Sequence, residues 1–82
     1  MNNFDILVSP NPSIGIVTIK IFNRSKFHKG KLILRNSIGK NLLETTFFEN
    51  NIQLDMSNVA KGFYFIEVVS NNLSVTTKLI LN

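Results

Sequence analysis

The sequence contains no cysteine, no tryptophan and only one histidine among its 82 residues. Without cysteine, the chain can form neither a disulfide framework nor a thiolate zinc site. A serine hydrolase needs a serine, a histidine and an acid held together. The one histidine, His28, lies between Phe27 and Lys29 in a polar segment. We interpret it as a solvated loop residue rather than a general base.

Acidic residues are also few. Spacing alone leaves a carboxylate pair for glycoside hydrolysis open, but a domain of this length has little room for a substrate cleft. A calcium loop needs several clustered oxygens, a pattern that neither DMSN (55–58) nor FENN (48–51) has. We therefore expect no enzyme activity, no metal and no cofactor. The acidic residues are Asp5, Glu44, Glu49, Asp55 and Glu67.

Long apolar runs are absent as well. No stretch approaches the roughly 20 residues that span a bilayer, and MNNFDILVSP (1–10) lacks the basic region and cleavage site of a signal peptide. We expect no direct membrane insertion. Hydrophobic residues nevertheless make up 44% of the chain, which is typical of a folded protein. One domain, residues 1–82, is predicted.

Basic residues exceed acidic ones, which gives a formal charge of +4. They are scattered, except in NRSKFHKGK (23–31). Nucleic-acid binding favours a continuous basic stripe with interleaved aromatic residues. A nucleic-acid module is therefore the weakest of the functions considered, and we expect no nucleic-acid partner.

Apolar and polar residues alternate over most of the chain, with the period of a β-strand. Gly39 supplies the positive φ of a tight hairpin, and Asn71 with Asn72 closes a later one. Asp55 and Ser57 suit a turn or a single helical turn. The predicted strands are residues 4–8, 16–22, 31–36, 41–48, 52–54, 62–70 and 73–82.

About seven short strands without an amphipathic helix predict an all-β fold, an antiparallel two-sheet β-sandwich of immunoglobulin-like type. In so small a domain, each sheet must cover the other. The predicted core is Val17, Ile19, Ile21, Leu32, Leu34, Leu43, Ile52, Leu54, Tyr64, Ile66, Val68, Val75 and Leu79.

The segment VSPNPSIG (8–15) interrupts the first two strands. Pro10 and Pro12 fix φ and remove two backbone donors, so they end the first strand. Asn11 and Ser13 are expected to bond their own backbone, and Gly15 to free the chain to turn.

The ordered set P-N-P-S-x-G, N-S-I-G-K, I-x-L-D-M-S and K-G-F-Y-F-I-E-V, followed by a last strand with a lysine, resembles one family over residues 6–82. This family is the type A C-terminal sorting domain of the type IX secretion system of Bacteroidetes. Arg35 and Phe63 depart from its usual pattern, in which apolar and aliphatic residues stand there. The residues that match its motifs are Pro10, Asn11, Pro12, Gly15, Gly39, Gly62, Tyr64 and Lys78.

The resemblance implies a non-catalytic export signal at the C-terminus of a larger secreted protein, from which we expect this chain to be excised. Its implied partners are an N-terminally fused cargo domain, the type IX translocon and a cell-surface sortase peptidase. That peptidase removes the domain during release or attachment of the cargo. The implied location is the cell surface or the medium, reached through the periplasm and the outer membrane.

Within this interpretation, the last hairpin, residues 62–82, is predicted to carry the signal. Lys78 is expected to project from the opposite face to Leu79. Its stem would cover apolar surface while its ammonium stays in water. The structural alternative is that Lys78 is only a solubilising charge on an edge strand.

A second functional class is an extracellular adhesion or carbohydrate-binding sandwich. Such a module would use exposed aromatic rings as a sugar platform. Phe47 and Phe48 are adjacent, so one of them must point away from the core. The other candidates are Phe27 and Phe65.

Overall fold

The computed structural model describes residues 4–23 and 29–82. The regular structure of these residues consists of β-strands, in the places that the alternation predicts. None of them forms a helix long and apolar enough to cross a membrane. The strands are β1 (Asp5–Ser9), β2 (Ile16–Phe22), β3 (Gly30–Asn36), β4 (Asn41–Phe47), β5 (Asn51–Asp55), β6 (Gly62–Ser70) and β7 (Leu73–Leu81).

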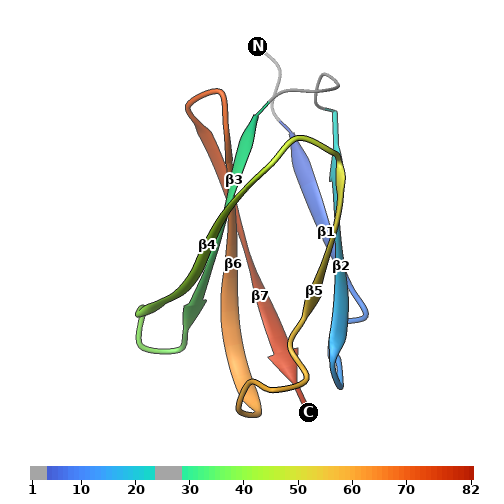
Figure 1. The fold of residues 1–82 in the computed structure, drawn as a ribbon, viewed down its shortest axis with the longest axis vertical. Coiled ribbons are helices and arrows are strands. Elements are labelled where there is room, and N and C mark those ends of the chain that lie inside the picture. Colours follow the sequence, from blue (N-terminus) through green and yellow to red (C-terminus); the bar gives the residue numbers. More distant parts are fainter. Residues whose placement is uncertain (1–3, 24–28) are drawn as a thin grey trace.

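The strands form two sheets, one of order β1-β2-β5 and one of order β4-β3-β6-β7. Every pair of neighbouring strands is antiparallel. The chain passes from one sheet to the other between β2 and β3, β4 and β5, and β5 and β6 (Figure 1). The predicted antiparallel two-sheet sandwich is therefore confirmed.

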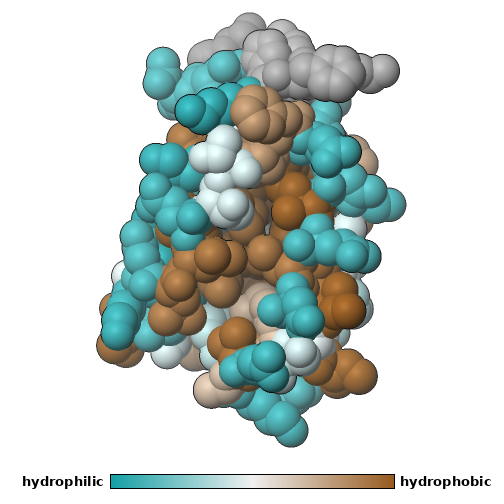
Figure 2. All heavy atoms as spheres, viewed as in Figure 1, coloured by the Kyte–Doolittle hydropathy of each residue, from teal (hydrophilic) through white to brown (hydrophobic). Residues whose placement is uncertain are grey.

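The core lies between the sheets and is built from the inward residue of each alternating pair. Ile19 in one sheet and Leu32, Ile66 and Leu79 in the other are fully buried. Figure 2 shows apolar side chains along the middle of the molecule, between polar flanks. Burying one such aliphatic side chain contributes about 1.5–3 kcal/mol.

The predicted core needs one correction and three adjustments. Leu43 is 41% exposed, although it pairs with the buried Leu34 and shares its face. The reason is the number of strands: β4 is the fourth strand of its sheet, whereas the described residues give the opposite sheet three. Ile52, Leu54 and Val75 are half-buried at the edge of the core.

Sequence reasoning missed several core residues. Phe47 closes the core at the end of β4, with its ring lying over Gly30, where any side chain would collide with it. Met56 is buried in the loop after β5. These contacts join segments far apart in the sequence, so alternation within one strand does not predict them. The other missed core residues are Phe4, Val8 and Leu81. Ile33 is also buried, but it lies on the outer face of its sheet, paired with Glu44 and Glu67.

The two ends of the sandwich carry different segments. The start of β1 and the β6–β7 hairpin lie at the upper end in Figure 1, and Phe4 directly precedes β1. The β1–β2, β3–β4 and β5–β6 connections and the end of β7 lie at the lower end (Figure 1). The predicted motif residues therefore gather toward the lower end.

Candidate functional site

The segment from Pro10 to Gly15, called the proline corner below, carries the chain from β1 to the edge of the other sheet. β1 ends at Ser9, directly before Pro10, as the loss of a backbone donor predicts. Both Ser9–Pro10 and Asn11–Pro12 are cis peptide bonds. Beyond them, Ser13 forms a parallel bridge with Leu81 of β7. The chain thus pairs with one sheet through β1 and with the other sheet through Ser13 of the proline corner.

Asn11 fastens the proline corner to β7 through its side chain. Its Nδ2 donates to the carbonyl oxygen of Lys78 at 2.8 Å, and its Oδ1 accepts from the backbone N–H of Ile80 at 3.0 Å. The amide therefore replaces two bonds that a further strand would make to this edge. The expectation that Asn11 bonds its own backbone was wrong, because its partners lie 67 and 69 residues away.

Ser13 continues the same pairing with its main chain. Its N–H donates to the carbonyl oxygen of Ile80 at 2.8 Å, and its carbonyl oxygen accepts from the N–H of Asn82 at 2.9 Å. Its buried hydroxyl accepts from the N–H of Gly15 at 3.1 Å, which is the local bond expected of it. The main-chain edge of β7 from Lys78 to Asn82 is therefore occupied by the proline corner.

Lys78 itself remains exposed on the outer face of β7, opposite in direction to the buried Leu79. Its Nζ lies 4.3 Å from the centre of the Phe63 ring. Phe63 in turn meets Phe65 edge to face, with 5.9 Å between ring centres. A cation over a ring at an exposed site is worth about 0.5–1 kcal/mol, so the ring orients the ammonium more than it stabilises the fold.

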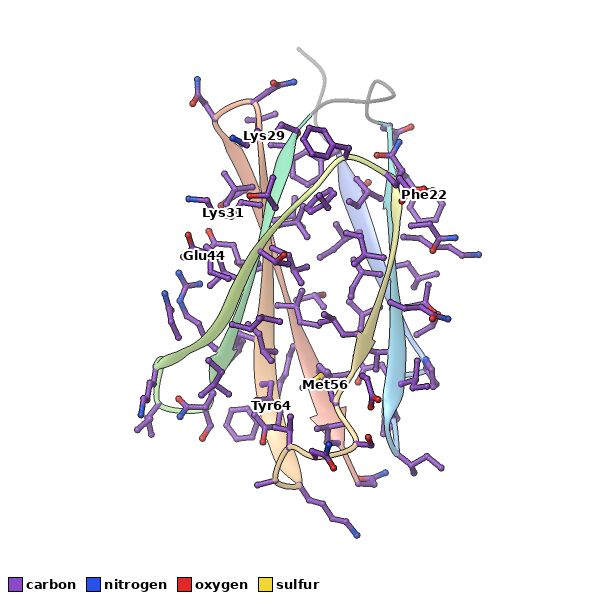
Figure 3. All side chains as sticks on the ribbon, viewed as in Figure 1. Phe22, Lys29, Lys31, Glu44, Met56 and Tyr64 are labelled. Carbon is purple, nitrogen blue, oxygen red and sulfur yellow. The ribbon has the colours of Figure 1, made fainter. Side chains whose placement is uncertain are left out.

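Beside this cluster, Arg35 donates to Glu67 at 2.5 Å on the same outer face. Farther along the sheet, Lys31 and Glu44 form an exposed ion pair at 3.2 Å (Figure 3). The two departures from the family pattern, Arg35 and Phe63, thus both have partners on this face. Their side chains lie outside the core and leave the packing between the sheets unchanged.

Tyr64 fixes the start of β6 from inside the sandwich. Its ring is buried, and its hydroxyl donates to the carbonyl oxygen of Ala60, four residues upstream. This arrangement is the tyrosine corner of immunoglobulin-like sandwiches. Figure 3 shows Tyr64 at the lower end of β6, beside the loop that leads from β5. Gly62, between the two bonded residues, has a φ of 142°, which favours glycine.

Gly39 belongs to the β3–β4 hairpin. Its φ of 87° is the positive value that the sequence predicts, and its N–H donates to the carbonyl oxygen of Asn36 at 3.0 Å. The Asn36 side chain also closes the turn, accepting from the N–H groups of Ile38 at 3.1 Å and Lys40 at 2.9 Å. Gly39 therefore has a clear role in the geometry of this hairpin.

Gly15 has a different role from the one expected. Among the described glycines, only Gly39 and Gly62 have a positive φ. Gly15 instead binds the loop after β5: its carbonyl oxygen accepts from the N–H of Met56 at 3.1 Å. Its Cα lies close to Ser57, whose Cβ would stand 3.7 Å from a Cβ at this position. Gly15 thus links the proline corner to the D-M-S motif.

Asp55 organises that motif as a turn, not a helical turn. Its Oδ1 accepts from the N–H of Ser57 at 3.0 Å and from the Ser57 hydroxyl at 2.5 Å. These two hydrogen bonds, the hydroxyl bond first, lower the pKa of Asp55 below its ordinary value of 3.8. The Asp55 carboxylate thus stabilises the turn of this loop.

The chemistry available to the described residues is limited. Within residues 4–23 and 29–82, no three histidine, cysteine, aspartate or glutamate side chains come together as a metal site. Of the aromatic candidates, Phe47 is buried, Phe65 is half-buried and Phe48 is 56% exposed. Phe47 is therefore unable to serve in a sugar platform. Phe27, His28 and most of the basic segment lie outside the described residues.

Seven of the eight predicted motif residues thus form the turns and interstrand contacts at the lower end of the sandwich. The eighth, Lys78, projects from its surface. Sequence reasoning missed three contacts at this end: the pairing of Ser13 with β7, the bonds accepted by the Asn36 side chain, and the bond accepted by Ala60. Ser13, Asn36 and Ala60 act through polar or main-chain groups. For Asn36, its spacing before Gly39 gave a local signal, whereas nothing local predicted the link of Ser13 to β7 or the bond to Ala60.

The comparison with curated proteins found no match. The model of one protein family, described as the secretion system C-terminal sorting domain, matches residues 7–82. This match spans the proline corner, both sheets and Lys78, which are the features that the resemblance used. The family is one of sorting signals for type IX export and is in general not catalytic. The chain belongs to the family of type IX secretion system C-terminal sorting domains.

Proposed function

We propose that this domain is a non-catalytic signal that directs a cargo protein, fused to its N-terminus, through the type IX outer-membrane translocon. The observation that carries the proposal is the family match over residues 7–82. In this proposal, residues 1–82 are one sorting domain at the C-terminus of a larger secreted protein. A cell-surface sortase peptidase removes the domain when the cargo is released or attached.

The arrangement of the two ends supports this proposal. The chain enters β1 through Phe4 at the upper end, and the motif residues gather at the lower end (Figure 1). A cargo domain upstream of Phe4 therefore leaves the lower end accessible. Burial of Phe4 also ties the entry point to the core, so cargo and signal are joined through a folded body.

The proposed recognition surface is the outer face at the end of β7, with Lys78 as its charged group. The main chain of β7 from Lys78 onward is taken by the proline corner, so side chains must provide the signal there. The Phe63 ring holds the ammonium of Lys78 over the sheet. In this proposal Pro10, Asn11, Pro12, Gly15, Gly39, Gly62 and Tyr64 shape the surface rather than contact the translocon.

The experiment is a fusion of residues 1–82 to the C-terminus of an inert reporter with an inner-membrane signal peptide, expressed in a strain with a type IX system. We expect the reporter at the cell surface or in the medium, with the domain cleaved off. Retention of a folded, uncleaved fusion in the periplasm would contradict the proposal.

Lys78→Ala tests the recognition surface. We expect a change in melting temperature of no more than a few degrees, because only an exposed cation–π contact is lost. We expect export to fall clearly. Lys31→Ala is the matched control, since Lys31 lies on the same outer face in an exposed ion pair. Normal export of a normally stable Lys78→Ala fusion would remove Lys78 from the signal.

A further inference from the structure

Within residues 4–23 and 29–82, the sandwich has four strands in one sheet and three in the other, and no strand lies opposite β4. β4 is exposed along its length except at Phe47. Leu43, which points toward the missing position, is 41% exposed. Ile52 and Leu54 of β5 point toward the same interior and are half-buried. Apolar side chains from both sheets therefore line the place where a fourth strand would lie.

The main chain of β5 is also oriented to pair with a strand there. The carbonyl oxygen of Asn50 accepts from Ile21 at 2.9 Å, and the N–H of Met56 donates to Gly15 at 3.1 Å. Even-numbered residues along β5 thus direct their main-chain groups toward β2. Alternate residues of a strand bond to opposite sides. Gln53, at the centre of β5, therefore directs its N–H and carbonyl groups away from the sheet, as do its odd-numbered neighbours.

The edges of the molecule differ in how they are protected. Natural proteins cover or interrupt strand edges that would otherwise pair with another chain. The proline corner covers the end of β7, and Pro10 stops β1. β5 lies on the opposite side of its sheet from β1, at the side where β4 diverges from it (Figure 1). Figure 2 shows apolar side chains reaching the surface along the middle of the view, between the two sheets.

Two arguments identify the occupant as a lone extended segment rather than a second copy of this domain. A second copy that paired through its own β5 would bring its four-stranded sheet into the space that β4 occupies. In addition, a dimer held only by its two five-residue β5 strands would bury much less than the roughly 1,200 Å² typical of a stable complex, so β5 alone would not hold two copies together. Strand pairing with β5 is therefore suited to transient recognition.

The charge at the edge of β5 further defines the chemistry of the incoming segment. Asp55 ends β5 and is exposed, and its hydrogen bonds from Ser57 favour the carboxylate form. A cation on the incoming segment would therefore be stabilised where it passes Asp55. The other outward residues of β5, Asn51 and Gln53, are neutral amides and set no further charge.

We propose that the export machinery recognises this domain by strand addition, an inference that rests on the proposed function. In this proposal, an extended segment of the machinery pairs with β5 in the missing fourth position. Its alternate side chains are apolar and cover Leu43, Ile52 and Leu54, and it carries a lysine or arginine beside Asp55. The domain is then a sandwich whose second sheet is completed only when it is recognised.

The test uses the reporter fusion with two variants aimed at this position. Gln53→Pro removes an outward N–H and leaves the bonds between β5 and β2 in place. Leu43→Asp places a charge in the apolar lining. We expect both variants to melt within a few degrees of the unmodified domain. We expect export to fall about tenfold or more, because one main-chain acceptor or one apolar contact of the partner is left unmatched.

Two control variants introduce the same residue types, proline and aspartate, at positions outside the proposed site. Glu44→Pro removes an N–H directed to the open side of β4, and Leu7→Asp changes a leucine of similar exposure on the outer face of β1. Both should be exported normally. If Gln53→Pro does not fold, the comparison of Leu43→Asp with Leu7→Asp decides.

The outcomes separate the two proposals. Normal export of folded Gln53→Pro and Leu43→Asp fusions, or equal loss in the control variants, would overturn strand addition at β5 while leaving the sorting function intact. Failure of the unmodified fusion to be exported would overturn the sorting function, and strand addition with it.

Discussion

Replacing Asn11 by alanine tests whether the proline corner is held to β7 by one side chain. The variant removes the 2.8 Å bond to the Lys78 carbonyl and the 3.0 Å bond from the Ile80 N–H. Each neutral hydrogen bond contributes about 0.5–1.5 kcal/mol net, and both of these are exposed, so a loss of about 1–2 kcal/mol is expected. For a domain of this size, about 4–8 °C of melting temperature corresponds to each kcal/mol.

The assay is thermal and urea unfolding of the 82-residue chain, monitored by far-ultraviolet circular dichroism. Asn11→Asp adds a sharper comparison, because a carboxylate keeps the bond from Ile80 but repels the Lys78 carbonyl oxygen, so it should destabilise at least as much as alanine. Asn58→Ala, at an exposed loop position, is the control and should change the free energy of unfolding by less than about 0.5 kcal/mol. A loss below that value for Asn11→Ala would refute the clamp.

Three further changes test other parts of the structure. Tyr64→Phe removes the hydroxyl bond to Ala60 and should lower the free energy of unfolding by about 0.5–1.5 kcal/mol, measured by urea unfolding; no loss would refute the tyrosine corner. Ile66→Ala should cost about 2–5 kcal/mol, and Leu43→Ala less than about 1 kcal/mol, because Ile66 is fully buried and Leu43 is 41% exposed; equal losses would show that the faces of β4 are misassigned. Because Asp55 has a lowered pKa in the folded state, its interaction with Ser57 stabilises the fold above about pH 3.8 and is lost as the pH falls through the folded pKa. Carboxyl titration by NMR should therefore give Asp55 a higher pKa in Ser57→Ala, and an unchanged pKa would contradict the assigned cause.

Local patterns predicted the strands well because each strand has one buried face. Alternation in β2 and β6 identifies Ile19 and Ile66 as core residues, and both are fully buried. Turn chemistry was equally informative, since Gly39, Asn71 and Asn72 have the positive φ values that their hairpins require. These are properties of a residue and its near neighbours, so sequence carries them directly.

The errors arise where a distant segment decides the environment. Leu43 has the correct alternation for a core residue, but in the described part of the chain the opposite sheet has no strand that covers it. Asn11 is short and polar, which favours local bonds, yet the proline corner brings it beside β7 and gives it two partners there. Phe47 and Phe48 could not be assigned to faces until the contact between Phe47 and Gly30 was known. Strand number and sheet order are global properties, and no local pattern reports them.

The motif residues illustrate the same division between local and global information. Their order along the chain was sufficient to indicate the family, whose model matches residues 7–82. Their roles as clamp, turn and corner became visible only when the lower end of the sandwich was assembled. What the proposed signal presents to a partner is therefore the surface that these contacts hold in place, with Lys78 exposed on it.

The most direct test of the central claim is the location of one reporter carrying residues 1–82, compared between a strain with an intact type IX translocon and an isogenic strain in which the translocon is disrupted. The same reporter without the domain serves as the control for leakage. The account predicts reporter outside the cell in the intact strain and in the periplasm in the disrupted strain. Equal amounts outside the cell in both strains, or retention in both, would contradict the account.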